Sequence, residues 1–405
     1  MRITMKELTR QMQSVISDRY SDLAQLQQQL ATGKRLLRPS DNPVDTANDI
    51  KLRSALAQQT QYKTNIQDGL AFMNVTDTAM QSMNTIMQRL RELAVQGSSD
   101  TMSQTDRLSI QQEADQLFRQ LITLTNTNYK GDYIFGGTQS KIAPFPVQQS
   151  SAASVSDYTT LKMAYFDGTG GVGAAAQIRN AFDNSAITNI LPGSMKLSIG
   201  AAVYSEGTDF TVDYVNGTIT PLNAALAIDV SDGGTFGGPN YQSGAVSLAF
   251  DYVSRGKDVY GNTVSNGGNV LRDIESGVVM PVNIPGDELI VNQQSGVDMI
   301  GTMVRFQQNL IYNSTAGINT AIGEIDKTFQ AILSAQSKNG ARINRLETTQ
   351  TRNEQQTATT TQLASELEDA DMAEAATNFS LMQTVYNAAL KSSAMTMQHS
   401  LVDYL

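Results

Sequence analysis

Apolar residues recur with helical spacing near both ends of the chain. At each end, seven positions span 22 residues in six steps, a mean of 3.67 residues, which is close to the turn of an α-helix. The N-terminal stripe consists of Leu8, Met12, Val15, Arg19, Leu23, Leu26 and Leu30, and only Arg19 interrupts its apolar character. The C-terminal stripe consists of Phe379, Met382, Tyr386, Leu390, Ala394, Met397 and Leu401. The pattern predicts a matching terminal helix at each end.

Signals for helix ends follow the N-terminal stripe. Gly33 suits the position just past a helix, and Pro39 prevents the helix from resuming at once. Asn42 before Pro43 is typical of a helix start, and Asp45 places an acid in the first turn. We therefore expect one helix to stop at Gly33 and a long second helix to follow Asn42.

Three further stripes predict a bundle of long helices. The first has a mean spacing of 3.5 residues, the period of a left-handed coiled coil, so it requires a partner helix. The second follows a break at Gly97-Ser-Ser-Asp100 and is expected to fold back as that partner, and the third can join the same bundle. The stripes are Ile66, Leu70, Met73, Thr76, Met80, Met83, Met87, Leu90 and Ala94; Ile110, Ala114, Leu117, Leu121 and Leu124; and Ile318, Ile322, Ile325, Phe329, Ile332, Gln336, Asn339, Ile343 and Leu346. The four methionines are interpreted as buried core rather than as an adaptable binding groove.

Glycine and proline concentrate in the middle of the chain. Residues 131–296 hold 23 of the 30 glycines and 7 of the 9 prolines, and they carry −8 of the net charge of −10. Apolar residues alternate with polar ones at residues 210–214, 246–252 and 278–284, which predicts strands. The first of these runs leads into Asn216-Gly217, a strong hairpin signal.

Together these patterns predict an α+β fold. Long helical coiled-coil or bundle arms from both chain ends flank a central β-rich insert. The expected domains are a terminal coiled-coil assembly domain of residues 1–40 with 365–405, a helical bundle domain of residues 41–142 with 295–364, and a β-rich variable outer domain of residues 143–294.

Composition argues against several classes of function. With 39 acidic and 29 basic residues, the chain is not expected to bind nucleic acid or a membrane. It has no cysteine and a single histidine, His399, which excludes thiolate catalysis, disulfides and multi-histidine metal sites. No apolar run resembles a signal peptide or a membrane helix, so we expect a chain that is cytoplasmic or leaves by a route other than Sec.

Gly168-Thr-Gly170-Gly-Val-Gly173 matches the fingerprint of dinucleotide sites. It follows a strand-like segment at residues 163–166 and precedes a helix-like segment at residues 174–179. No acid lies about 20 residues further on, where a ribose ligand belongs, and no second βαβ unit follows. A glycine-rich surface loop is therefore favoured, and a nucleotide-binding enzyme stays as a remote alternative.

The acidic run Glu366-Leu-Glu368-Asp369-Ala-Asp371-Met-Ala-Glu374 could indicate metal binding or paired-carboxylate catalysis. At about 100° per residue its five acids spread around a helix, so a solvated face is the favoured interpretation. His399 is interpreted as a helix-surface residue. We expect no catalytic, cofactor or metal site and no enzymatic activity.

The terminal stripes indicate that the chain assembles with others. A lone pair of terminal helices leaves half of the surroundings of each stripe in water, and its burial does not offset the entropy of ordering about 30 residues. Contacts between like subunits build rings or helical tubes. We therefore expect the apolar residues of both stripes, Ala394 excepted, to form the assembly interface of a homo-oligomeric ring or tubular layer.

Several short blocks resemble the bacterial flagellin superfamily in its hook-associated form. They are Leu30-Ala-Thr-Gly-Lys-Arg35 with Arg38-Pro-Ser-Asp-Asn-Pro43, Tyr133-Ile-Phe-Gly-Gly137, which is similar to a segment of the hook-associated protein 3 family, and Gly340-Ala-Arg-Ile-Asn-Arg-Leu-Glu347 with Glu366-Leu-Glu-Asp-Ala-Asp371. The blocks bracket both arms in the order of that family. Between residues 143 and 294 only Pro285-Gly-Asp-Glu-Leu289 matches, and the end His399-Ser-Leu-Val-Asp-Tyr-Leu405 departs from the usual flagellin ending.

The resemblance implies a structural subunit of the flagellum at the hook–filament junction. Such a subunit adapts the hook end to the flagellin filament, and the flagellar type III apparatus exports it to the extracellular flagellum. The implied partners are further copies of the chain, hook-associated protein 1, flagellin and a flagellar export chaperone. The implied layout has the terminal coiled coil innermost and the β domain outermost. A filament-forming flagellin is the alternative.

Overall fold

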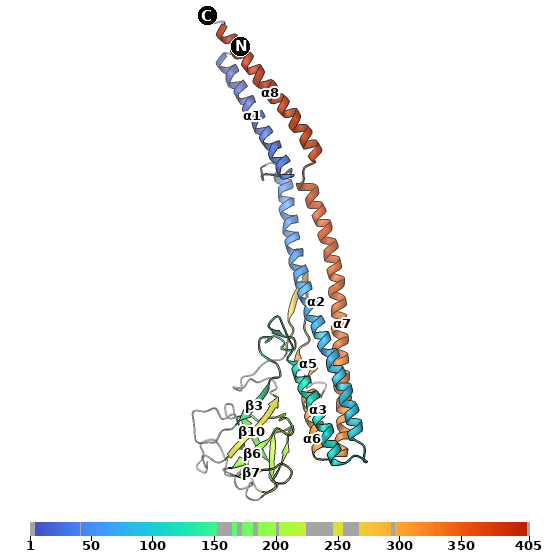
Figure 1. The fold of residues 1–405 in the computed structure, drawn as a ribbon. Helices are drawn as coiled ribbons and strands as arrows, with labels where there is room; N and C mark the ends of the chain where they lie inside the picture. Colours follow the sequence, from blue (N-terminus) through green and yellow to red (C-terminus); the bar gives the residue numbers. More distant parts are fainter. Residues whose placement is uncertain are drawn as a thin grey trace. The chain divides into compact units, whose positions relative to one another are not determined.

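The chain is helical toward both ends and β-rich in the middle (Figure 1), so the predicted α+β class is confirmed. The computed structural model describes residues 5–40, 42–151, 164–167, 172–180, 185–199, 202–223, 246–253, 267–292 and 296–402. The main helices are α1 (Met5–Thr32), α2 (Pro43–Gly97), α3 (Gln104–Thr125), α6 (Met299–Ile311), α7 (Thr315–Glu368) and α8 (Met372–Val402), with the short α5 (Gly286–Leu289).

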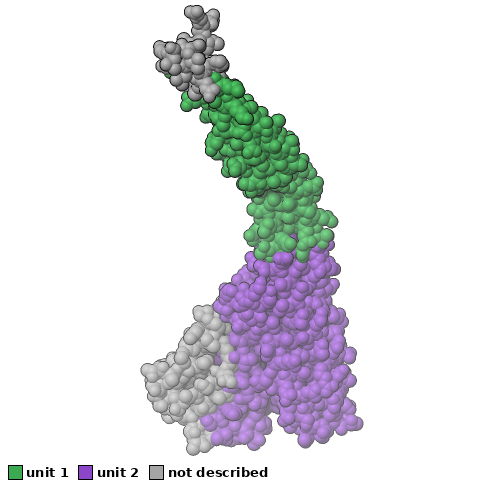
Figure 2. All heavy atoms as spheres, turned by 45° about the horizontal axis from the view of Figure 1, so that its top comes forward, with its two compact units in different colours: residues 1–64, 349–405 green, residues 65–348 purple. Residues whose placement is uncertain are grey.

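The chain divides into two compact units that share the helices α2 and α7 (Figure 2). The terminal unit combines residues 1–64 with residues 349–405, and the central unit holds residues 65–348. The three-part division expected from the sequence stays a prediction.

Four helical segments form the bundle of the central unit. They are α3, α6 and the parts of α2 and α7 that belong to this unit. Polar pairs link each helix to the next: Arg89 with Glu113 at 2.7 Å, Gln111 with Gln307 at 3.3 Å, Arg305 with Glu324 at 2.8 Å, and Arg91 with Asp326 at 2.6 Å. α3 begins with a capping box of Ser103 and Asp106 after the predicted break. It therefore folds back along the bundle as predicted.

The seam between α2 and α7 is apolar in the central unit. Met73, Met80, Met83 and Met87 of α2 are fully buried, as are the isoleucines at 318, 325 and 332 of α7. Both stripes were predicted from their spacing, and the interpretation of the methionines as core is confirmed. Burial of this kind contributes about 1.5–3 kcal/mol for each large side chain.

One buried polar residue interrupts this seam. Asn339 is fully buried, and its Nδ2 donates a hydrogen bond to the Met73 carbonyl oxygen at 3.0 Å. Its Oδ1 atom is buried without a partner. Such a residue lowers the free energy of unfolding, because a polar atom is desolvated. It also favours one register of the two helices over the others, because the hydrogen bond forms only in that register.

The described part of the β-rich region contains two four-stranded antiparallel sheets. One has the order β3 (Val147–Ser151), β10 (Val246–Val253), β6 (Lys196–Ile199), β7 (Ala202–Tyr204), and the other β4 (Ala164–Asp167), β5 (Ala176–Asn180), β9 (Thr218–Pro221), β8 (Phe210–Asp213). The predicted Asn216-Gly217 hairpin joins β8 to β9, with Asp213 opposite Thr218. Gly217 has φ of +68°, and a Cβ there would lie 1.7 Å from the Ile187 carbonyl oxygen, so only glycine fits.

The other described strands pair as short two-stranded hairpins. They are β1 (Asn128–Tyr129) with β2 (Asp132–Tyr133), β11 (Leu271–Glu275) with β12 (Val278–Pro281), and β13 (Val291–Asn292) with β14 (Val297–Asp298). Ile274 and Met280 of the second hairpin pack with Ile66, Met73 and Leu346 of the long helices. This part of the insert therefore belongs to the core of the helical bundle.

The region of the glycine motif differs from the expectation. Residues 168–171 lie outside the described residues, but the segment expected to be helix-like contains strand β5, which pairs antiparallel with β4. A dinucleotide site needs a strand followed by a helix whose N-terminus faces the phosphates. The helix-like interpretation was wrong, because pairing with β4 and β9 overrides the helix propensity of the alanines at 174–176.

A cluster around Glu206 joins the sheets to the bundle. Tyr312, which follows α6, donates to Glu206 Oε1 at 2.7 Å, and Tyr214 donates to the other oxygen of the same carboxylate. The Val212 amide also donates to the Tyr312 hydroxyl, at 2.9 Å. Burial raises the pKa of both phenols above their ordinary value, and the nearby Glu206 carboxylate raises it further. Both hydroxyls therefore stay protonated donors that hold β8 against the end of α6.

We expect Asn339→Leu to stabilise the central unit, because it removes the unpaired Oδ1 atom and adds apolar burial. The Met73 carbonyl keeps its intrahelical partner, so a gain of about 1 kcal/mol should raise Tm by roughly 2–4 °C. Thermal circular dichroism measures the change. Asn344→Leu is the control, since Asn344 is exposed on the same helix. A fall in Tm for Asn339→Leu that the control does not share would contradict this account of the seam.

Candidate assembly surface

Helices α1 and α8 lie side by side in the terminal unit (Figure 1). The rings of Tyr20 and Tyr386 are in contact, with centroids 6.1 Å apart. A groove of about 260 Å³ between the helices is lined by Gln11, Met12, Val15, Ile16, Ala389 and Ser392. The structure thus brings the N-terminal and C-terminal stripes together as a pair.

The side of α8 that faces α1 follows the predicted stripe only at first. Its less exposed positions are Ala375, Phe379, Met382, Tyr386, Ala389 and Ser393, with steps that alternate between four and three residues. Leu390 of the predicted stripe is 41% exposed instead. The predicted stripe takes successive steps of four after Met382, which carries Leu390 and Ala394 off the paired face.

The matching side of α1 holds Met12, Leu23, Leu26 and Leu30, all half-buried, while Val15 is 45% exposed. The side chains of Leu8, Met397 and Leu401 fall outside the described residues, although their backbones belong to the two helices. The role of the predicted interface residues in contacts between chains stays a prediction.

The terminal pair has almost no core of its own. Among its described residues, α1 has no buried side chain and α8 has only Ala375. Large apolar side chains face water instead, among them Leu381, which is 63% exposed, and Met395, which is 67% exposed. Exposed apolar surface of this extent is typical of an interaction site.

A linker with well-defined ends separates α1 from α2. Gly33 has φ of +72°, and its amide donates to the Gln29 carbonyl oxygen at 2.8 Å, which confirms the predicted helix stop. Asn42 Oδ1 accepts bonds from the Val44 and Asp45 amides at 3.2 and 3.1 Å, which confirms the predicted restart.

The break between α7 and α8 is hydrogen-bonded to this linker. The Arg35 amide donates to the Glu368 carbonyl oxygen at 2.6 Å, and the Ala370 amide donates to the Gly33 carbonyl oxygen at 2.9 Å. Lys34 and Asp369 form the corresponding antiparallel bridge. Main-chain hydrogen bonds therefore join the segment that follows the C-terminal end of α1 to the segment that precedes the N-terminal end of α8.

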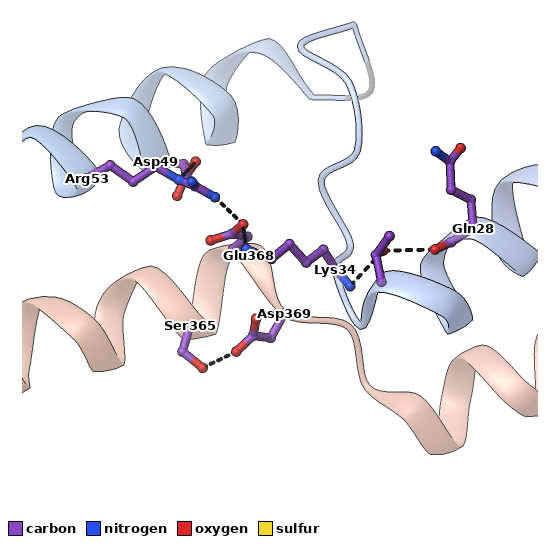
Figure 3. Close-up of polar contacts among 8 residues, drawn as sticks. Gln28, Lys34, Asp49, Arg53, Ser365, Glu368 and Asp369 are labelled. Atoms are coloured by element: carbon purple, nitrogen blue, oxygen red, sulfur yellow. Dashed lines mark hydrogen bonds and ion pairs between the residues drawn. The ribbon is translucent and has the colours of Figure 1, made fainter.

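Ion pairs surround this bridge (Figure 3). The Glu368 carboxylate is buried and pairs with Lys34 and with Arg53, and Arg53 Nε also donates to Asp49 Oδ2 at 2.8 Å. We call Lys34, Asp49, Arg53 and Glu368 the linker cluster. Lys34 and Arg53 are about half exposed, which weakens each pair, but a buried carboxylate stripped of its partners is costly.

The linker cluster corrects the interpretation of the acidic run. A solvated helical face was expected, but α7 ends at Glu368, so the run does not follow one helix. Asp371 instead caps α8, with its Oδ1 accepting from the Ala373 and Glu374 amides at 2.9 and 3.1 Å. The partners of Glu368 could not be found from a local sequence pattern, because Lys34 and Arg53 lie more than 300 residues away.

Two other blocks that carried the resemblance also meet, within the central unit. Ile134 and Phe135 of the first block are buried, and the Phe135 carbonyl oxygen accepts from the Gly286 amide of the second at 3.0 Å. A Cβ on Gly286 would lie 2.8 Å from that oxygen and 3.0 Å from the ring of Phe145. Glycine is therefore required at this position.

Within the described ranges, no group of three acidic or histidine side chains is placed to hold a metal ion. No described helix is both long and apolar enough to cross a bilayer.

Comparison with known proteins decides the family. Residues 3–140 match the bacterial flagellin N-terminal helical region, and residues 322–405 match the bacterial flagellin C-terminal helical region. Together the two matches span more than half of the chain, and they include all of the linker cluster. The chain belongs to the bacterial flagellin family. Members of this family are structural proteins of the flagellum.

Relatives within the flagellin family are of two kinds. Flagellar hook-associated protein 3 of Salmonella typhimurium is 30% identical over 146 residues, which cover 36% of this chain and 46% of that protein. A flagellin of Clostridium tyrobutyricum is 30% identical over 135 residues, 32% of this chain and 36% of that protein. The match thus covers less than half the length of either relative.

Among solved structures, FlgL of Bacillus cereus is similar with a TM-score of 0.42 and 14% identity, over 78% of this chain and 99% of that one. A likeness at this level carries no weight for function.

Gly286→Ala is expected to destabilise the central unit, because its new methyl group collides with main chain that cannot move freely. The overpacking should cost about 1–3 kcal/mol and lower Tm by roughly 2–4 °C per kcal/mol. Gly323→Ala is the matched control: it lies in helix α7 with open space around it, so alanine should leave Tm unchanged or raise it. Equal melting temperatures for the two variants in thermal denaturation would refute the close approach.

Proposed function

We propose that this chain is a structural subunit of the bacterial flagellum that forms the hook–filament junction and adapts the hook end to the flagellin filament. The observation that carries the proposal is the terminal pair: two long helices of a flagellin-family chain that are paired with each other but have almost no buried side chains. Such a pair is stabilised by further apolar partners, and copies of the same chain supply them.

The expected assembly is a homo-oligomeric ring or tubular layer. The apolar side chains that α1 and α8 leave exposed, such as Leu381 and Leu390, lie beyond the face that joins the two helices. In a tube each pair has neighbours on more than one side, so exposed residues on several faces become buried. The predicted interface residues fit this arrangement, whether they face the partner helix or a neighbouring chain.

One feature favours a junction subunit over a flagellin. Residues 133–137 resemble the corresponding segment of the hook-associated protein 3 family, and residues 134–137 are buried. A filament-forming flagellin is the second candidate, supported by the similarity to flagellins over the helical regions.

The remaining parts of the proposal follow from this assignment. The chain acts by assembly and not by catalysis, and it needs no cofactor. Its partners are hook-associated protein 1 on the hook side, flagellin on the filament side and a flagellar export chaperone before export. It leaves the cell through the flagellar type III apparatus and is located on the extracellular flagellum.

Electron microscopy of the purified full-length chain tests the proposal. A junction subunit should form a short layer on isolated hook ends and then stop until flagellin is added. A flagellin should form long filaments by itself. Long filaments from this chain alone would therefore refute the junction role and establish the alternative.

A proline in α8 should separate assembly from monomer stability. Val385 is exposed and lies off the face toward α1, so Val385→Pro acts mainly through the backbone, where an interior proline costs about 3 kcal/mol. If α8 becomes ordered only in the assembly, the Tm of the isolated chain stays unchanged while attachment to hook ends and flagellin is lost. Val385→Ala, which keeps the helix, should assemble normally. A drop of several degrees in the Tm of the isolated Val385→Pro chain would show instead that the helix is folded before assembly.

A further inference from the structure

The described side chains that pair α1 with α8 include no buried polar group that could fix how far one helix is displaced along the other. The face of α8 toward α1 consists of alanine, aromatic and methionine side chains, together with Ser393. Where α2 meets α7, in contrast, the buried Asn339 and Asn353 each donate to a main-chain carbonyl of α2. Apolar heptads pair equally well after a shift of seven residues, unless a polar contact selects one register.

Chain connectivity does not select the register either. Ten residues, 33–42, separate α1 from α2. A segment of that length can span up to roughly 33 Å, whereas a shift by one heptad moves a helix by only about 10 Å. Another contact must therefore hold α1 at its level.

We infer that the linker cluster sets the register of α1 against α8. Gly33, Lys34 and Arg35 follow directly after α1. Glu368 ends α7, and Asp369 and Ala370 belong to the short segment between α7 and α8. The two main-chain hydrogen bonds and the pair of Lys34 with Glu368 form together at one relative position of these segments.

A shift of α1 along α8 costs free energy, because it breaks the contacts that form at this relative position. The buried Glu368 carboxylate would lose Lys34, and the Gly33 carbonyl and the Arg35 amide would lose their partners. Arg53 does not move with α1, because it belongs to α2 and is held by Asp49. It therefore keeps the Glu368 carboxylate aimed at the linker, and Glu368 acts as a positioning residue for both terminal helices.

This inference deepens the proposed function, on which its purpose rests. Neighbouring chains would contact a surface made of side chains from both α1 and α8. A shift of one helix by a heptad would break up that composite surface even if both helices stayed folded. By holding α1 and α8 in one register, the linker cluster would keep their side chains aligned as a single contact surface for neighbouring chains.

Cross-linking between introduced cysteines tests the register, because the chain has no cysteine of its own. Tyr20→Cys combined with Tyr386→Cys reports the observed register, since these two rings are in contact. Tyr20→Cys combined with Phe379→Cys or with Ser393→Cys reports a shift of seven residues in either direction. The full-length chain, alone and mixed with flagellin, is treated with a short bismaleimide, and products within one chain are separated from dimers by electrophoresis.

With Glu368 intact, the 20–386 pair should give most of the product. Glu368→Gln should raise the share of the two shifted pairs about tenfold, which corresponds to 1.4 kcal/mol. Lys34→Gln should act in the same way. Adding it to Glu368→Gln should change little, since Glu368→Gln already removes the pair of Lys34 with Glu368. Glu366→Gln is the matched control, because Glu366 is exposed on the same last turn of α7 and bonds only along its own helix in the contacts described, to Gln362 at 3.0 Å.

Unchanged selectivity in Glu368→Gln would overturn the inference, as would an unmodified cluster that shows no preference for the 20–386 pair. Loss of selectivity in Glu366→Gln would also overturn it, by showing that any change at this helix end has the same effect. The proposed function can fail separately from this inference. If the register depends on Glu368 but the chain forms no layer on hook ends, the junction role is refuted and the register role of Glu368 stands.

Discussion

The antiparallel pairing of α2 with α7 is the interaction on which the rest of the structure depends. These helices come from opposite halves of the sequence, and fully buried methionines and isoleucines line their seam. Other described elements pack around them: α3 and α6 complete the bundle, the β11–β12 hairpin packs on the seam, and the cluster around Glu206 fixes the sheets to α6. The buried asparagines show that the pairing is selected for one register as well as for stability.

Burial differs sharply between the two helix pairs, although both have apolar residues at helical spacing. In the central unit other elements cover the stripes, so the four methionines of α2 are fully buried, as are Ile318, Ile325 and Ile332 of α7. In the terminal unit α1 and α8 pack mainly on each other, and none of their described stripe residues is buried. The same sequence pattern therefore gives a self-sufficient core in one place and an interaction surface in the other, and the number of neighbours makes the difference.

Features determined by a few adjacent residues could be predicted from the sequence. The stop at Gly33, the start at Asn42 and the hairpin at Asn216-Gly217 each depend on local backbone chemistry. Features that depend on distant partners could not. β5 is a strand because β4 and β9 pair with it, and Glu368 is buried because Lys34 and Arg53 reach it from the other end of the chain. The face of α8 toward α1 contains Ala389 and not Leu390, because helix pairing, and not the ideal helical turn, sets the local steps.

The contact between Gly33 and Ala370 also constrains the order in which the chain can fold. The residues that hold the end of α1 lie more than 300 positions further along the sequence. In any process that delivers the chain from its N-terminal side, α1 emerges before the other described helices and finds its partners last. Its contacts close a loop of more than 300 residues, and loop closure of this size makes formation slow. The α1 segment must therefore remain soluble without structure until its distant partners are present, which is consistent with the many glutamines and serines that α1 carries between its apolar positions.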